Sequence, residues 1–209
     1  MKNLRMFSLL VGLGAMTALC PSAADAHIKL LEPSSIWATE DGGKGAPPCG
    51  AGFGSNIVTK AQGGHPLTLR ILEWIGHPGH YRIALAGSRA QLPPDPEVKE
   101  GIGGPKSVST AIDSNPKPPV IADGVFAHTT NTRGVEWKMD VMLPNITCEK
   151  CTLQVIEFMS ESSMPKLLPS DSTEALKAGR VFYHACTDLS ITADPALPPA
   201  DKAWTDIAK

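Results

Sequence analysis

Six histidines are the residues best suited to metal chemistry, and one of them follows a candidate cleavage site. Residues 1–5 are short and basic, and residues 6–19 are apolar, which is typical of a secretory signal peptide. Ala24 and Ala26 would occupy the −3 and −1 positions of an A-x-A site, so cleavage after Ala26 would leave His27 with a free α-amine. That residue then offers an amine and an imidazole nitrogen in one chelate ring. Nitrogen-donor sites hold copper more tightly than other divalent first-row metals.

A second imidazole would complete a three-nitrogen, T-shaped copper site. His77 and His80 flank a tight Pro78-Gly79 turn just before an expected strand, which would hold a histidine at the end of a β-sandwich. Turn histidines are mostly solvated, so this pair is informative only together with a chelating His27. The other histidines of the chain are His65, His128 and His184.

The composition limits the classes of protein to which the chain can belong. Residues 27–209 suit one domain with a full hydrophobic core. The formal charge of −2 disfavours nucleic-acid binding, and no second apolar run approaches the length of a membrane span. We therefore expect a secreted or periplasmic monomer, exported by a Sec-type signal peptide, with no membrane or nucleic-acid partner. Cys20 could indicate a lipoprotein, but Thr17-Ala18-Leu19-Cys20 is a poor lipobox.

Four cysteines remain after residue 26: Cys49, Cys148, Cys151 and Cys186. An even number in an exported chain predicts two disulfides, with three connectivities open. The Cys148-x-x-Cys151 motif could be redox-active or bind zinc in a cytosolic protein, but no second CxxC or His-x-His pair accompanies it. Our first choice pairs Cys148 with Cys151 and Cys49 with Cys186.

Short strands are expected to carry most of these residues. Alternating or apolar runs predict strands within residues 28–33, 55–60, 66–74, 81–86, 134–143, 152–159 and 180–191.

The segments between the expected strands are rich in proline and glycine. Residues 34–56 and 87–120 are expected to be loops, the second a long surface excursion, and residues 172–178 could form one or two helical turns. The pattern indicates an all-β fold, an immunoglobulin- or fibronectin III-like antiparallel β-sandwich with long loops. The domain would span residues 27–191, and residues 192–209 would form a proline-rich tail.

Three segments of the chain form a recognisable combination. They are His27-Ile28 at the expected mature start, the run His77-Pro78-Gly79-His80-Tyr81-Arg82-Ile83-Ala84-Leu85, and the pair formed by Cys148-Glu149-Lys150-Cys151-Thr152-Leu153-Gln154 with Phe182-Tyr183-His184-Ala185-Cys186-Thr187-Asp188-Leu189. The combination resembles lytic polysaccharide monooxygenases, particularly their insect-type and bacterial chitin-active branches. It spans most of the chain after residue 26, in short islands between unlike loops.

The resemblance implies a histidine brace in which His27 and His77 hold one copper ion. Tyr183 would lie at the axial position of the copper, and Gln154 or Glu157 would reach its oxygen-binding side. For Gln154 and Glu157 the alternative is an ordinary strand residue that faces water. The implied activity is oxidative cleavage of a β-linked polysaccharide, chitin or cellulose, with O2 or H2O2 and an external electron donor.

Two other functions stay open. One is a non-catalytic exported protein that binds or delivers copper with the same brace, and the weaker one is a carbohydrate-binding module without metal chemistry. An enzyme should present an exposed ring on a polar, copper-centred face, whereas a carrier should bury its copper behind loops such as 87–125, with histidines such as His65, His128 or His184 nearby.

We expect core packing for two tryptophans and three methionines in strand patterns: Trp74, Trp137, Met139, Met142 and Met159.

Overall fold

The computed structural model of the 209-residue chain describes residues 28–34, 37–38, 47–50, 53–54, 57–100, 108–129, 133–159 and 181–208. The expected signal peptide, His27 and the helical turns expected at 172–178 lie outside the described residues. Among the residues that are described, no helix has the length and apolar character that a membrane span requires.

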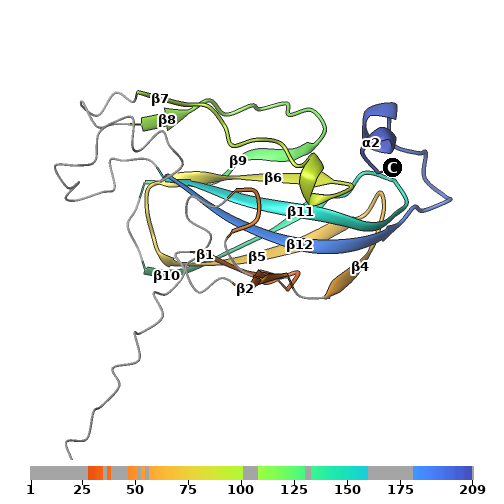
Figure 1. Ribbon diagram of the computed structural model, residues 1–209, viewed down its shortest axis with the longest axis horizontal. Helices are drawn as coiled ribbons and strands as arrows, with labels where there is room; N and C mark the ends of the chain where they lie inside the picture. The colour runs from red at the N-terminus through yellow and green to blue at the C-terminus, as the bar shows by residue number, and fades with distance from the viewer. Residues whose placement is uncertain are drawn as a thin grey trace, which may run out of the picture.

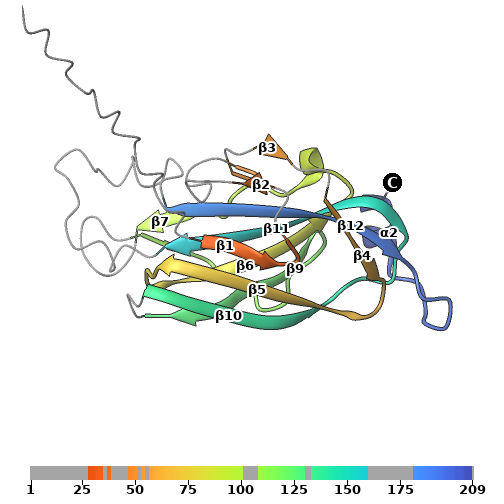
Figure 2. The ribbon, with the colours of Figure 1, turned by 90° about the horizontal axis from the view of Figure 1, so that it is seen from below.

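Two β-sheets pack face to face, as Figures 1 and 2 show. The three-stranded sheet has the order β1–β5–β10, formed by β1 (Ile28–Glu32), β5 (Pro66–Ile75) and β10 (Arg133–Met142). The five-stranded sheet has the order β4–β12–β11–β6–β9, formed by β4 (Val58–Gln62), β12 (Phe182–Thr192), β11 (Cys148–Met159), β6 (Gly79–Ala86) and β9 (Val120–His128). The predicted all-β sandwich is confirmed. Its strand pairs are antiparallel except for β4 with β12, which is parallel.

The hydrophobic core lies between the two sheets because successive side chains on a strand point to opposite faces. Leu69 and Ile71 of β5 are fully buried, and they belong to the same apolar cluster as Leu153 and Val155 of β11. Tyr183 of β12 is a fully buried member of that cluster.

The excursion that follows β6 is described over residues 87–100 and 108–120, and this part of it packs against the outer face of the five-stranded sheet. It contains the short 3-10 helix η1 (Arg89–Gln91) and the strands β7 (Val98–Glu100) and β8 (Val108–Thr110), and its last residue begins β9. Val98 and Val108 join a second apolar cluster with Ile156, Phe158, Val181 and Phe182. In Figure 1, β7 and β8 lie on the side of this sheet that faces away from β5 and β10.

Polar side chains of the same outer face also hold the excursion. Arg82 Nη2 donates to the carbonyl oxygen of Pro94 at 2.7 Å, and His184 Nε2 lies 2.7 Å from Asp95 Oδ1. The expectation of a plain surface loop over residues 87–120 is therefore too simple.

Both disulfides of our first choice are present. Cys49 is bonded to Cys186 across 137 positions of sequence, and Cys148 is bonded to Cys151. The first bridge fastens residues 47–50 to β12. The two-stranded pair β2 (Trp37–Ala38) with β3 (Phe53–Gly54) completes the described strands.

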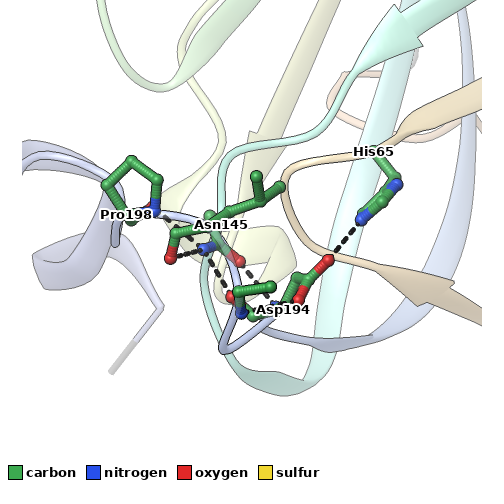
Figure 3. Close-up of polar contacts among 6 residues, drawn as sticks. His65, Asn145, Asp194 and Pro198 are labelled. Carbon is green, nitrogen blue, oxygen red and sulfur yellow. Dashed lines mark hydrogen bonds and ion pairs between the residues drawn. The ribbon is translucent and has the colours of Figure 1, made fainter.

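The segment expected as a tail docks on the sandwich through Asn145. The Asn145 Nδ2 atom lies 3.0, 3.1 and 2.9 Å from the carbonyl oxygens of Asp194, Leu197 and Pro198. The Asn145 Oδ1 atom accepts a hydrogen bond from the Asp194 amide at 2.8 Å. Figure 3 shows this side chain enclosed by the segment, with His65 Nε2 2.7 Å from Asp194 Oδ2.

A short helix, α2 (Lys202–Ile207), ends the described chain. Asp201 caps it by accepting a hydrogen bond from the Trp204 amide at 3.1 Å, which satisfies one of the free amides of the first turn. Trp204 and Ala208 pack against the main apolar cluster, so residues 194–208 are part of the domain surface.

Candidate functional site

A buried carboxylate, Glu73, is the centre of a polar cluster between the sheets. Glu73 is 0% exposed. It follows the inward-facing Leu69 and Ile71 by four and two residues, so the alternation of β5 turns it toward the interior as well. The β5–β6 turn, four residues further along, lies at the end of the sandwich opposite α2 (Figure 1).

Four donors from four different elements surround the Glu73 carboxylate. Oε1 accepts a hydrogen bond from the amide of His77 in the β5–β6 turn at 2.9 Å, and it lies 3.2 Å from Nε2 of His128 in β9. Oε2 accepts from the Tyr81 hydroxyl at 3.1 Å and from Trp137 Nε1 at 2.6 Å. A buried carboxylate with this many donors is satisfied as an anion.

The pKa of Glu73 follows from these contacts. Burial alone would raise this pKa, but hydrogen bonds from His128, Trp137, the His77 amide and Glu157 outweigh burial and lower it to about 2. Glu73 is therefore ionised at neutral pH. Glu157 is itself 0% exposed.

His128 is the positively charged partner of Glu73. Its Nδ1 lies 2.6 Å from the carbonyl oxygen of Phe126, and its Nε2 faces the Glu73 carboxylate. Both partners only accept hydrogen bonds, so both ring nitrogens carry protons. Burial lowers the pKa of His128, but the hydrogen bonds to Glu73 and to the Phe126 carbonyl outweigh it, so the pKa lies above its ordinary value. An imidazolium in this position has no lone pair for a metal.

Aromatic rings enclose the cluster. Phe126 stacks on Trp137 with 5.5 Å between ring centroids and meets Tyr81 edge-on at 5.7 Å, and Trp137 lies 4.9 Å from the ring of His128. Phe126 has a φ of 52°, a conformation that is uncommon for a residue with a side chain. Such backbone outliers are concentrated at functional sites.

Three sequence-predicted residues meet this cluster or stand beside it. His77 is half-buried and contributes its amide to Glu73. Glu157 on β11 lies opposite Tyr183 on β12 and opposite Tyr81 on β6, so these side chains form one row across the sheet. The structure therefore places Glu157 beside Tyr183, and both Glu157 and the His77 amide interact with Glu73.

Gln154 lies elsewhere, and His27 is outside the described residues. Gln154 is three residues from Glu157 on β11 and so faces the other side of the sheet, where its Nε2 donates to the Pro48 carbonyl at 2.8 Å. Ile28, the residue after His27 in the sequence, is paired with Glu73 at the start of β1.

The described side chains do not contain a complete metal site. Among them, no three His, Cys, Asp or Glu groups are arranged to share one ion. His65 lies within hydrogen-bond distance of Asp194, His80 of Thr110 and His184 of Asp95, whereas His128 faces Glu73 and Phe126 inside the cluster. His77 itself lies on the β5–β6 turn at the end of the sandwich, with its amide bonded to Glu73.

Two expectations about core packing are wrong. Trp74 is 46% exposed and Met142 is 59% exposed. Each lies at an even-numbered position of a strand whose odd-numbered residues face the core, so each side chain points outward. Trp137 and Met139 do pack against the core, and Met159 is fully buried.

Comparisons with known proteins add the following. No protein-family model matches the chain, and no curated protein matches it significantly. Among solved structures, the chain is similar to "Lytic Polysaccharide Monooxygenase AA15 from Thermobia domestica in the Cu(I) State", with 15% sequence identity, a TM-score of 0.37, and coverage of 70% of this chain and 71% of that chain.

Proposed function

We propose that this protein is an exported copper protein of the lytic polysaccharide monooxygenase type, with His27 and His77 as ligands of one copper ion. The observation that carries the proposal is the pairing of Ile28 with Glu73, whose carboxylate accepts the His77 amide. Consecutive α-carbons are about 3.8 Å apart. Ile28, the residue that follows His27 in the sequence, therefore lies beside the end of β5 that leads into the turn bearing His77.

Copper at such a site would supply one-electron redox chemistry with O2 or H2O2, given an external electron donor. The chain's own residues have simpler tasks. Glu73 holds the backbone of His77, and the fully buried ring of Tyr183 keeps water from the inner face of β12. Glu157, in register with Tyr183, places a second buried carboxyl group beside Glu73.

The exposed ring of Trp74 supports a polysaccharide substrate, chitin or cellulose. Trp74 is next to Glu73 in β5 but points to the outer face of the three-stranded sheet. On the neighbouring strand β10, Gly134 lies between the residues that pair with Glu73 and Ile75, so it is the neighbour of Trp74. Gly134 has no side chain, and a Cβ built there would have no other atom within 4 Å, so this part of the strand leaves the indole uncovered. An uncovered indole at the sheet end offers an apolar face on which a sugar ring can stack.

The alternative of a non-catalytic copper carrier calls for additional histidines around the metal. Of the candidates His65, His128 and His184, only His128 joins the cluster, and both of its ring nitrogens are donors there. This arrangement, together with the exposed Trp74, favours the catalytic proposal.

The proposal is tested by copper titration and by a product assay. Both use protein processed to begin at His27. His77→Ala should weaken Cu(II) binding by at least about 100-fold, because one of three nitrogen ligands is lost. His65→Ala, which removes a histidine bonded to Asp194 at the far end of the sandwich, should bind as the wild type does. Oxidised oligosaccharides should then appear from chitin or cellulose with copper, a reductant and H2O2, and Trp74→Ala should release fewer. Equal copper binding by both histidine variants would contradict the proposal.

A further inference from the structure

We propose that Glu73 is a positioning residue for the copper site, because its carboxylate fixes the backbone of His77 and with it the direction of the His77 imidazole. This inference rests on the proposed function, since it explains how one proposed ligand is held. It concerns a residue that contributes no atom to the brace.

The turn that carries His77 is held on both sides. On one side the His77 amide donates to Glu73 Oε1 at 2.9 Å. On the other side Gly79 lies so close to β11 that a Cβ there would be 1.9 Å from the carbonyl oxygen of Phe158. Pro78 is buried between them and restricts the backbone of the residue before it. With both sides fixed, the hydrogen bond to Glu73 sets the orientation of the His77 peptide.

A carboxylate is required at position 73 because all four groups around it are donors. Oε1 faces the His77 amide and His128, and Oε2 faces Tyr81 and Trp137. A glutamine has one acceptor oxygen, and its amide nitrogen donates. In Glu73→Gln the amide nitrogen would therefore oppose one of the two pairs of donors, and the His77 amide or its neighbours would have to move.

Tyr81→Phe provides a matched control for this substitution. It removes a donor from Oε2 and retains the Glu73 charge, the His128 charge and the contact between Oε1 and the His77 amide. Tyr81 is fully buried beside the same carboxylate, so its substitution perturbs the same region of the core. A general loss of packing would affect both variants, whereas a loss of His77 positioning would affect Glu73→Gln alone.

The experiment is Cu(II) titration with EPR spectroscopy on wild type, Glu73→Gln and Tyr81→Phe, each beginning at His27. We expect Glu73→Gln to lose about 10- to 100-fold in affinity, the usual effect of removing a group that orients a ligand, and to show altered copper hyperfine splitting. Tyr81→Phe should stay within about threefold of wild type. Wild-type affinity and spectrum in Glu73→Gln, or an equal loss in Tyr81→Phe, would overturn the positioning role alone. Absence of copper binding in the wild type would overturn the proposed function and this inference with it.

A measurement on the metal-free wild type keeps the inference testable if Glu73→Gln does not fold. Hydrogen exchange followed by NMR should show the His77 amide strongly protected, because its acceptor is fully buried. Exchange of this amide at the rate of an unstructured peptide would overturn the proposal.

Discussion

The imidazole of His128 and the carboxylate of Glu73 form an ion pair between the sheets, with 3.2 Å between Nε2 and Oε1. Their side chains are 7% and 1% exposed, so water screens the pair only weakly. Neutral groups also bond to both partners: the Phe126 carbonyl bonds to His128, and the Trp137 and Tyr81 side chains bond to Glu73. The pair therefore links protonation to folding at the proposed copper site.

The first prediction is the pH dependence of the metal-free protein. The pKa of Glu73 falls from 4.5 to about 2 on folding, so its contribution to stability is complete above pH 4.5 and is lost as the pH falls toward 2. The pKa of His128 rises above 6.5, so its contribution is complete below pH 6.5 and is lost as the pH rises through the raised value. Both contributions to stability are therefore complete between pH 4.5 and pH 6.5.

Thermal unfolding with a chelator present measures this dependence. We expect His128→Asn to lose more stability relative to wild type at pH 5.5 than at pH 8.5. An identical stability loss for His128→Asn at both pH values would contradict the assignment of an imidazolium.

The second prediction concerns the indole donor. Trp137→Phe retains a ring against Phe126 but removes the 2.6 Å hydrogen bond to a buried anion, and we expect a loss of about 1.5–3 kcal/mol in the free energy of unfolding. Trp74→Phe is the matched control, since that ring is exposed, and should change stability by less than about 0.5 kcal/mol. Urea denaturation measures both. A loss in Trp74→Phe as large as in Trp137→Phe would refute the prediction.

A third prediction compares the two disulfides. Cys49–Cys186 closes a loop of 137 positions and Cys148–Cys151 one of 3 positions. By chain entropy the long loop stabilises the fold by about 5 kcal/mol and the short one by about 2 kcal/mol. The double substitution Cys49→Ala/Cys186→Ala should thus destabilise more than Cys148→Ala/Cys151→Ala in denaturant titrations. A larger loss of stability in Cys148→Ala/Cys151→Ala would show that local packing around the cysteines outweighs the entropy that each disulfide removes from the unfolded chain.

The fourth prediction concerns the C-terminal segment. Asn145→Ala removes contacts to three carbonyl groups and one amide of residues 194–198, and we expect a loss of about 2–3 kcal/mol. Amides of residues 194–208 should exchange faster, and protease should cut there first. Asn115→Ala, on an exposed turn, is the control. Unchanged exchange in residues 194–208 would show that Trp204 packing alone holds the segment.

Much of the fold could be predicted from the alternation of apolar and polar residues along the strands. The strands over residues 66–74, 81–86 and 134–143 are found within two residues of the predicted ends, because each has one face in the core and one in water. β9 was missed. It follows a proline-rich segment, and its pairing with β6 shifts register three times, so its inward residues keep no regular period.

The candidate site was only partly visible in the sequence. The same alternation that places Leu69 and Ile71 in the core places Glu73 there, and an acidic residue at an inward position is the signal that would have identified it. Alternation likewise turns Trp74 outward, against the expectation of core packing. The involvement of His128 could not be inferred, since it depends on the pairing of β9 with β6. Gln154 and Glu157 could be separated by their odd spacing on one strand.

The most direct test of the histidine brace is Cu(II) titration and EPR of protein that begins at His27, against protein with one extra residue before His27. We expect tight one-to-one binding with a tetragonal spectrum for the first form, because its α-amine and imidazole would chelate the metal together with His77. The extended form should lose at least about 100-fold in affinity, since the terminal amine is no longer available. Equal affinity and equal spectra for the two forms would contradict the histidine brace and the function built on it.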